Sequence, residues 1–76
     1  MTNRTNAVLI DIELYNAEGT IHQILELAEK GIFKVQRVGD FVRIVFTSHA
    51  DALIVQQLIN EMVDELAPDK VMLAIA

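Results

Sequence analysis

The spacing of apolar residues changes once between Ala7 and Lys30, and this change constrains the fold more than any other feature of the sequence. From Ala7 to Tyr15 the side chains alternate with a period of two, which predicts a strand. After a loop at 16–19, apolar residues recur at i, i+3, i+4 and i+7, which predicts a helix with one buried side. The inward residues of the strand are Val8, Ile10, Ile12 and Leu14.

The predicted helix begins at Glu18 or Thr20 and ends at Lys30. Thr20 and Gln23 have the spacing of a capping box, and Glu18 adds negative charge at the positive end of the helix dipole. Gly31 follows, and we expect it to end the helix in the left-handed conformation. The core-facing residues of this helix are Ile21, Ile24, Leu25 and Ala28.

Two apolar segments, Ile32 to Val38 and Phe41 to Ser48, flank the pair Gly39-Asp40. A two-residue loop that opens with glycine predicts a tight hairpin with Val38 opposite Phe41. A slip of one residue would mix the two sides of the hairpin, so the pattern itself supports this register. The register predicts a buried side made of Phe33, Val35, Val42, Ile44 and Phe46.

The second predicted helix begins at Ser48 or His49 and ends at about Leu66 or Ala67, before Pro68. Ser48 is the expected cap, because its hydroxyl oxygen can accept a hydrogen bond from a free backbone N–H of the first turn. The core-facing residues of this helix are Ala52, Val55, Ile59, Met62, Val63 and Leu66.

A last alternating segment, Val71 to Ile75, predicts a fourth strand, so the order of elements is βαββαβ. Right-handed crossovers place the third strand between the first and second, and the fourth on the other side of the first. The predicted fold class is α+β, a ferredoxin-like fold in which two helices cover one face of a four-stranded antiparallel sheet. We expect one domain over residues 1–76, with residues 1–6 as a flexible lead-in.

The composition favours association with another chain. Hydrophobic residues make up 53% of the 76 residues, and there is no cysteine. A domain of this size cannot bury so much apolar surface alone, so we expect a homo-oligomer, most simply a homodimer, or a larger partner protein. The net charge of −5 would repel phosphates, so nucleic acid is not expected as a partner. We find no signal peptide and no apolar run of about 20 residues, so we expect a cytoplasmic protein that does not bind a membrane.

No group of residues has the spacing of a catalytic or metal centre, so we expect no enzyme activity, no metal and no cofactor. Ser48 and His49 are adjacent, but side chains of neighbouring residues do not converge, and a helix cap explains Ser48 better. His22 and His49 fall on different predicted helices and lack the closely spaced partners of zinc sites.

The outer face of the predicted sheet has no cover within the chain, and we interpret it as an interface. Its apolar residues are Leu9, Tyr15, Val38, Phe41, Val45 and Met72. The charged residues between them, which are expected to form cross-strand ion pairs, are Asp11, Glu13, Lys34 and Arg43. Apolar area with a few charges is typical of interfaces, although scattered exposed apolar residues are also normal on any sheet. Leu53 and Ile54 are a second candidate surface.

The segment 16–25, NAEGTIHQIL, resembles the first loop and helix of ACT domains, which are small regulatory modules that sense amino acids. Asn16 and Gly19 match the pattern of that family, and Glu18 stands where the family usually has proline. The segment 28–32, AEKGI, resembles the run into the family's second strand. As an order and spacing of elements, the resemblance extends from Ile10 to Ile75.

This resemblance implies a small amino-acid ligand bound at the first loop, usually across an interface between paired domains. The implied ligand-binding residues are Asn16, Glu18, Gly19, Thr20 and Ile21, with the backbone N–H groups of the last two holding a carboxylate. We therefore expect a non-enzymatic regulatory or oligomerisation module. The alternative is an acidic protein-interaction module (an adaptor, small subunit or inhibitor) that uses the open sheet face or the acidic second helix.

Overall fold

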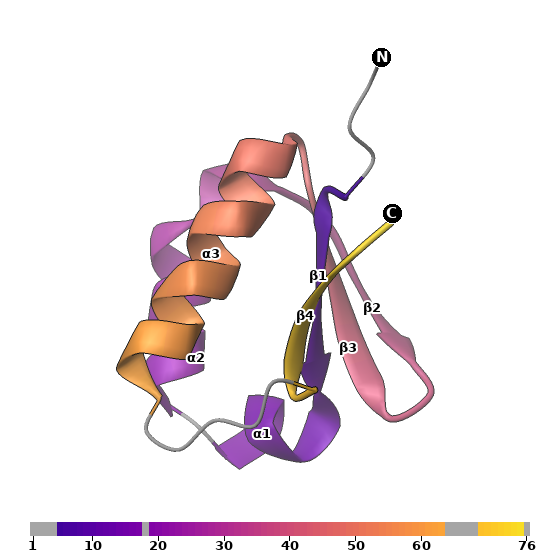
Figure 1. The fold of residues 1–76 in the computed structure, drawn as a ribbon, viewed down its shortest axis with the longest axis vertical. Coiled ribbons are helices and arrows are strands. Elements are labelled where there is room, and N and C mark those ends of the chain that lie inside the picture. Colours follow the sequence, from indigo (N-terminus) through magenta and orange to yellow (C-terminus); the bar gives the residue numbers. More distant parts are fainter. Residues whose placement is uncertain (1–4, 18, 64–68, 76) are drawn as a thin grey trace.

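The computed structural model describes residues 5–17, 19–63 and 69–75, and it has an α+β architecture (Figure 1). Three predicted features lie outside these residues: the ligand-binding role of Glu18, the core position of Leu66, and most of the lead-in. The elements in chain order are β1 (Ala7–Asp11), α1 (Ile12–Ala17), α2 (Gly19–Leu27), the 3-10 helix η1 (Glu29–Gly31), β2 (Ile32–Val38), β3 (Phe41–Phe46), α3 (His49–Met62) and β4 (Val71–Ala74).

The four strands form one antiparallel sheet in the order β2-β3-β1-β4. This confirms the predicted sheet, with the third strand between the first and second and the fourth beyond the first. The two longer helices, α2 and α3, lie side by side on one face of the sheet, while α1 lies at one end (Figure 1). No helix within the described residues is long and apolar enough to cross a membrane.

β1 is shorter than the prediction, because its last residue caps a helix. The Asp11 carboxylate accepts hydrogen bonds from the backbone N–H groups of Glu13 (3.0 Å) and Leu14 (3.3 Å). These bonds satisfy N–H groups that the first turn of a helix leaves free, so the chain turns into α1 at Ile12. The predicted strand from Ala7 to Tyr15 is therefore wrong beyond Asp11. Glu13 and Tyr15 belong to a helix, and Tyr15 packs against the core.

The transition from α2 to β2 also differs from the prediction. α2 ends at Leu27, and η1 carries the chain to Gly31, whose N–H donates to the Ala28 carbonyl (2.9 Å). The described glycine with positive φ is Gly39, at 60°, and not Gly31. Gly31 is constrained instead by space, because an added Cβ would lie 2.8 Å from Oδ2 of Asp51. The left-handed helix end predicted for Gly31 is wrong.

The hairpin between β2 and β3 has the predicted turn at Gly39-Asp40, where positive φ suits glycine. Val38 lies opposite Phe41 and Val35 opposite Ile44, as predicted. The register then shifts, because Lys34 lies opposite Val45 but Ile32 opposite Phe46. Phe33 is the extra residue of this bulge and is 73% exposed. Its predicted place in the core is wrong, and so is that of Val35, which is 51% exposed.

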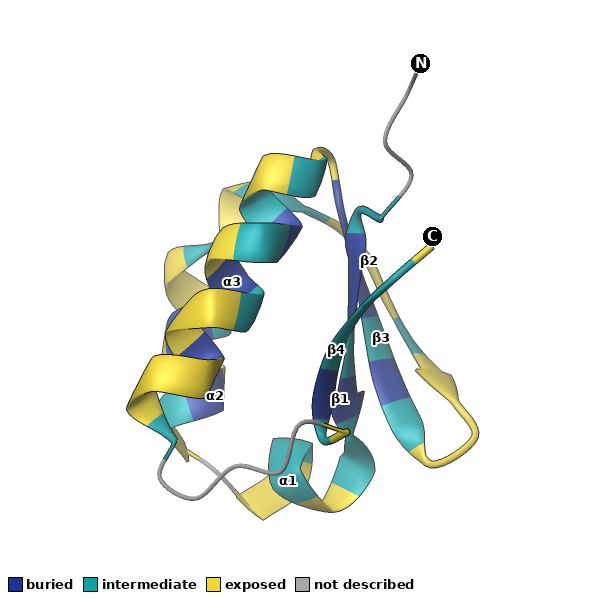
Figure 2. Cartoon of the chain, viewed as in Figure 1, coloured by how far each residue is buried: buried dark blue, intermediate teal, exposed yellow. Residues whose placement is uncertain are grey.

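The core lies between the sheet and the two longer helices (Figure 2). Its buried residues are Val8, Ile10, Ile21, Ile24, Val42, Ile44, Phe46, Ala52, Val55, Ile59 and Val71. α3 starts as predicted, since the Asp51 N–H donates to Oγ of Ser48 (3.2 Å). It ends earlier than predicted, because Val63 already has extended backbone. Val63 packs against the core, whereas Met62 is 58% exposed, so the prediction of a core Met62 is wrong.

Candidate functional site

The loop predicted to bind a ligand is a short connection between α1 and α2. Asn16 lies in the last turn of α1 and Gly19 begins α2, and both are exposed. Thr20 is half-buried, and the Ile21 side chain is part of the core, so Ile21 can offer a ligand only its backbone. Two neighbouring side chains tie the helices together.

The tie consists of Tyr15 and His22. Their rings lie 4.8 Å apart between centroids, and His22 Nε2 hydrogen-bonds to the Tyr15 carbonyl oxygen. The bond therefore links α1 directly to α2. His22 thus has a structural partner, which the spacing of residues in the sequence did not reveal.

The predicted interface on the open sheet face is smaller than expected. The register places Leu9 of β1 between Arg43 of β3 and Met72 of β4. Leu9, Phe41 and Met72 are half-buried, and Val38 is exposed at the edge. Two other predicted members cannot contribute, because Tyr15 lies in α1 and Val45 is buried against its neighbours. This face is therefore a narrow apolar strip rather than a broad patch.

The charged groups near this face are arranged differently from the prediction. The Asp11 carboxylate pairs with Lys70 (3.5 Å between Oδ2 and Nζ) rather than with Lys34 or Arg43. Desolvation raises the pKa of Asp11, but the Leu14 and Glu13 backbone N–H groups and Lys70 together outweigh it, so the pKa lies below its usual value of 3.8. Nε of Arg43 is buried without a hydrogen-bond partner among the described residues.

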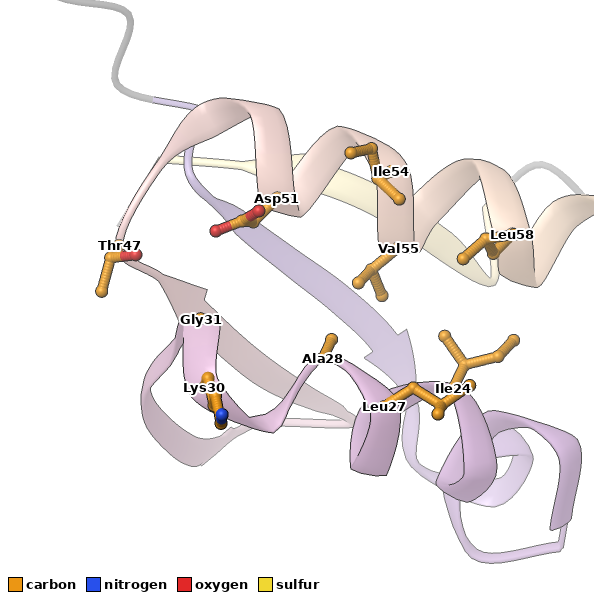
Figure 3. Close-up of a pocket in the computed structure, with 10 residues that line it drawn as sticks. All are labelled: Ile24, Leu27, Ala28, Lys30, Gly31, Thr47, Asp51, Ile54, Val55 and Leu58. Atoms are coloured by element: carbon orange, nitrogen blue, oxygen red, sulfur yellow. The ribbon is translucent and has the colours of Figure 1, made fainter.

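A groove of about 500 Å³ runs between α2 and α3 on the side away from the sheet (Figure 3). We call it the helix groove. Its lining residues are Ile24, Leu27, Ala28, Lys30, Gly31, Thr47, Asp51, Ile54, Val55 and Leu58. The floor is the buried core, while the walls are exposed: Leu27 is 89% exposed and Ile54 is 53% exposed. The helix groove is therefore apolar and open to solvent.

One end of the helix groove is polar. Lys30 and Asp51 lie there beside Gly31, whose missing side chain leaves room for the Asp51 carboxylate (Figure 3). The other end continues into an apolar stripe along α3, since Met62 lies four residues beyond Leu58 and is also exposed. The sequence indicated Ile54 as a surface residue, but not that it would face Leu27 across a groove.

The strand β2 forms a second accessible surface. In the described sheet it has a neighbour on one side only, β3, because it is the edge of the sheet. Its exposed apolar residues are Phe33, Val35 and Val38. α3 packs against β4, β1 and β3, and β2 packs mainly against β3. β2 is therefore an uncovered, partly apolar edge.

Charge is divided between the two layers of the structure. The described helices carry five acidic residues and one basic residue, Lys30. The acidic residues are Glu13, Glu26, Glu29, Asp51 and Glu61. The strands carry three basic residues and one acidic residue, which are Lys34, Arg37, Arg43 and Asp11. The helical layer is thus negative and the sheet positive. No cluster of three metal-ligating side chains occurs in the part of the chain that the structure describes.

Comparison of the chain with protein-family profiles, curated proteins and solved structures found no match. The two accessible surfaces, the β2 edge and the helix groove, are therefore the features that bear on function.

Proposed function

We propose that this chain is a non-enzymatic association and regulatory module that forms a homodimer through β2. The observation that carries the proposal is the uncovered edge, on which Phe33, Val35 and Val38 are exposed beside free backbone groups. An edge strand with exposed apolar residues favours pairing with another strand, because its N–H and C=O groups already have the geometry of a ladder. Natural monomers usually protect such edges.

The fold that we propose for the module is ferredoxin-like. It is supported by the antiparallel order β2-β3-β1-β4 and by α2 and α3 on one face of the sheet. In this interpretation α1 and η1 are additions at the two ends of the first helix of a βαββαβ arrangement. The fold alone does not specify the activity, so the edge and not the topology supports the function.

Charge selects a register for the dimer. Two copies of β2 related by a two-fold axis pair antiparallel around one central residue. A centre at Lys34 or Arg37 would set like charges directly opposite each other, which is unfavourable. A centre at Val35 sets Val35 against its copy and Phe33 against Arg37 of the second chain, where a cation–π contact forms. The two sheets would then join into one continuous sheet.

The directions of the backbone N–H and C=O groups of β2 also favour a dimer centred on Val35. In an antiparallel hairpin with a two-residue turn, Val38 and Phe41 form the hydrogen-bonded pair that closes the loop. Because hydrogen-bonded positions alternate, the N–H and C=O groups of Val35 and Arg37 point away from β3. These are the groups that a second β2 strand would use. Arg37 is held near the edge by the hydrogen bond from its Nε to the Gly39 carbonyl (3.0 Å).

A cysteine cross-link tests the register, since the chain has no cysteine of its own. In the proposed dimer the two Cα atoms at position 35 are about 5.5 Å apart, within the range of roughly 4.4–6.8 Å that a disulfide requires. Val35→Cys should therefore form a covalent dimer on mild oxidation. The matched control is Arg37→Cys, whose two copies would be about 14 Å apart and should stay unlinked.

Size measurements complete the test. Sedimentation at micromolar concentration should give a dimer for the natural sequence and a monomer for Val35→Asp, which places two carboxylates in contact. A monomer of the natural sequence, or equal cross-linking at positions 35 and 37, would contradict the proposal.

We further propose, on the resemblance to ACT domains, that a small amino acid binds at the α1–α2 connection. The candidate groups are the exposed Asn16 and Gly19, the backbone N–H groups of Thr20 and Ile21, and Glu18. Support comes from the position of Gly19 at the start of α2, where free N–H groups and the helix dipole favour a carboxylate.

Thermal melts with each amino acid test the ligand proposal. A ligand at 100 times its dissociation constant should add about 2.7 kcal/mol to the free energy of unfolding. Asn16→Ala should remove the shift, whereas Gln57→Ala, an exposed change on α3, should not. The absence of a shift with every amino acid would refute ligand binding and leave the dimer proposal intact.

The alternative, an acidic protein-interaction module, is favoured by one observation: the apolar helix groove lies in the acidic layer.

A further inference from the structure

We propose that the helix groove docks an amphipathic helix of a partner protein, with apolar residues on one face and basic residues on its flanks. The helix groove belongs to the helical layer, whereas β2 is the edge of the sheet. The inference therefore does not depend on the proposed homodimer. It is drawn from the shape, the length and the charge of this surface.

The shape excludes a small enclosed ligand. Sites for small molecules surround most of the ligand's surface. Here the outer walls are Leu27 and Ile54, which are exposed to 89% and 53%, so much of a small molecule would stay in solvent. An open channel between two helices is instead typical of helix-in-groove recognition. Figure 3 shows Ile54 and Leu58 on one side of this channel and Leu27 on the other.

The length fits two to three turns of a helix. Ile54, Leu58 and Met62 follow one another at intervals of four residues along α3. With a rise of 1.5 Å per residue, this exposed apolar stripe is about 12 Å long. A partner helix with apolar residues at i, i+4 and i+7 spans about 10.5 Å, close to the length of the stripe, so each could contact one residue of the stripe.

The charge selects a basic partner. Asp51 lines the polar end of the helix groove, and Glu61 lies three residues beyond Leu58 on the same side of α3. Lys30 lines the same end, but it is the one basic residue in the described helices, which carry five acidic residues. Lysine or arginine on the flanks of a docked helix would lie near Asp51 and Glu61. A second copy of this chain, facing the helix groove with its own helical layer, would bring acidic residues against acidic residues.

The test uses a synthetic probe. We would measure binding of a labelled amphipathic peptide of about 18 residues, with leucine at i, i+4 and i+7 and lysine on the flanks. A matched peptide with glutamate in place of lysine is the charge control. We expect saturable binding of the lysine peptide only, with shifts in the amide spectrum that map to α2 and α3.

Variants locate the binding surface. Ile54→Ser and Leu27→Ser, on opposite walls, should each weaken binding about tenfold, as expected for an anchor contact. Both residues are exposed, so both variants should fold, and the unchanged far-UV spectrum of each checks this. Ile75→Ser, at an exposed isoleucine that follows β4, is the matched control and should bind as tightly as the natural sequence. Glu61→Gln should weaken binding about threefold and reduce its salt dependence.

Any one of four results would overturn the inference. Three concern the peptide: no saturable binding of the lysine peptide, binding by Ile54→Ser as tight as by the natural sequence, or amide shifts outside α2 and α3. A change of sedimentation coefficient in Leu27→Ser would also overturn it, because the occupant would then be a second copy of this chain. The monomeric variant Val35→Asp should still bind the peptide. Loss of the dimer and loss of peptide binding are thus separate outcomes.

Discussion

The two edge strands, β4 and β2, have the same kind of position in the sheet but differ in burial (Figure 2). Val71 of β4 is buried, and the next three residues of β4 are half-buried, because α3 packs against this strand. Along β2 most residues are exposed, Phe33 and Val35 among them. An edge position therefore does not determine exposure. The path of the covering helix does, and it leaves β2 as the more exposed of the two edges.

The largest expected effect comes from replacing a valine by aspartate on each of the two edge strands. Val71→Asp would bury an unpaired charge opposite Ile10, and we expect a loss of more than about 4 kcal/mol in the free energy of unfolding, or no folding at all. Val35→Asp should cost the monomer less than about 1 kcal/mol, since its side chain reaches solvent. Urea unfolding of both variants measures the two costs. Similar losses in the two variants would mean that β2 is buried to the same extent as β4 and would contradict the comparison.

Gly31, the residue that precedes β2, gives the second test. A Cβ on residue 31 would lie 2.8 Å from Oδ2 of Asp51, so Gly31→Ala forces that carboxylate to move. Because Oδ2 is the far end of a flexible side chain that can rotate away, we expect a loss of no more than about 1 kcal/mol in the free energy of unfolding. In the double variant with Asp51→Ala the cost should be smaller than the sum of the single costs, because the clash is gone. Strict additivity would show that space at Gly31 does not matter.

The cap of α3 gives an effect of similar size, and this effect separates the two edges. Ser48→Ala removes the acceptor of the Asp51 N–H and should cost about 1 kcal/mol. Because α3 packs on β4, amide exchange should speed up more in β4 than in the part of β2 near the turn. Ser48→Asn retains an acceptor and is the control. Equal acceleration in both strands would indicate a single cooperative unit and remove the contrast between the edges.

The sequence predicts the covered part of this molecule better than the uncovered part. Periodicity correctly gave Ala52, Val55 and Ile59 as core residues, and crossover handedness gave the order of the strands. It placed Phe33 and Val35 in the core as well, because alternation shows which side a residue faces but not whether a helix lies over it. The bulge at Phe33 could not be predicted either, because the apolar residues of this segment alternate as they would in a regular strand.

The candidate sites were predictable only in part, for a related reason. The end of β1 depended on one local competition, in which the Asp11 side chain bonds to the backbone of Leu14 and starts a helix inside an apparently alternating segment. The helix groove depends on where two helices separate, which follows from the packing of Ile24 and Val55 beneath it. Ile54 fell outside the predicted stripe, and that was the signal of an exposed apolar surface.

The smallest expected effect concerns Asp11, which stands where β1 leaves the sheet and which is paired with Lys70 next to β4. Desolvation opposes its ionisation, but the backbone bonds from Leu14 and Glu13 and the charge of Lys70 set its pKa below 3.8 in the folded state. A carboxylate whose pKa is lower in the folded state stabilises the fold at pH values above its pKa in the unfolded chain. That stability is lost as the pH falls through its pKa in the folded state. Asp11→Asn keeps an acceptor for the cap but does not titrate. The free energy of unfolding of this variant, measured with urea, should be lower than that of the natural sequence. This difference should shrink as the pH falls from 6 to 3. A deficit that stays constant over this range would show that Asp11 acts only as a cap and that its ionisation does not support the covered edge.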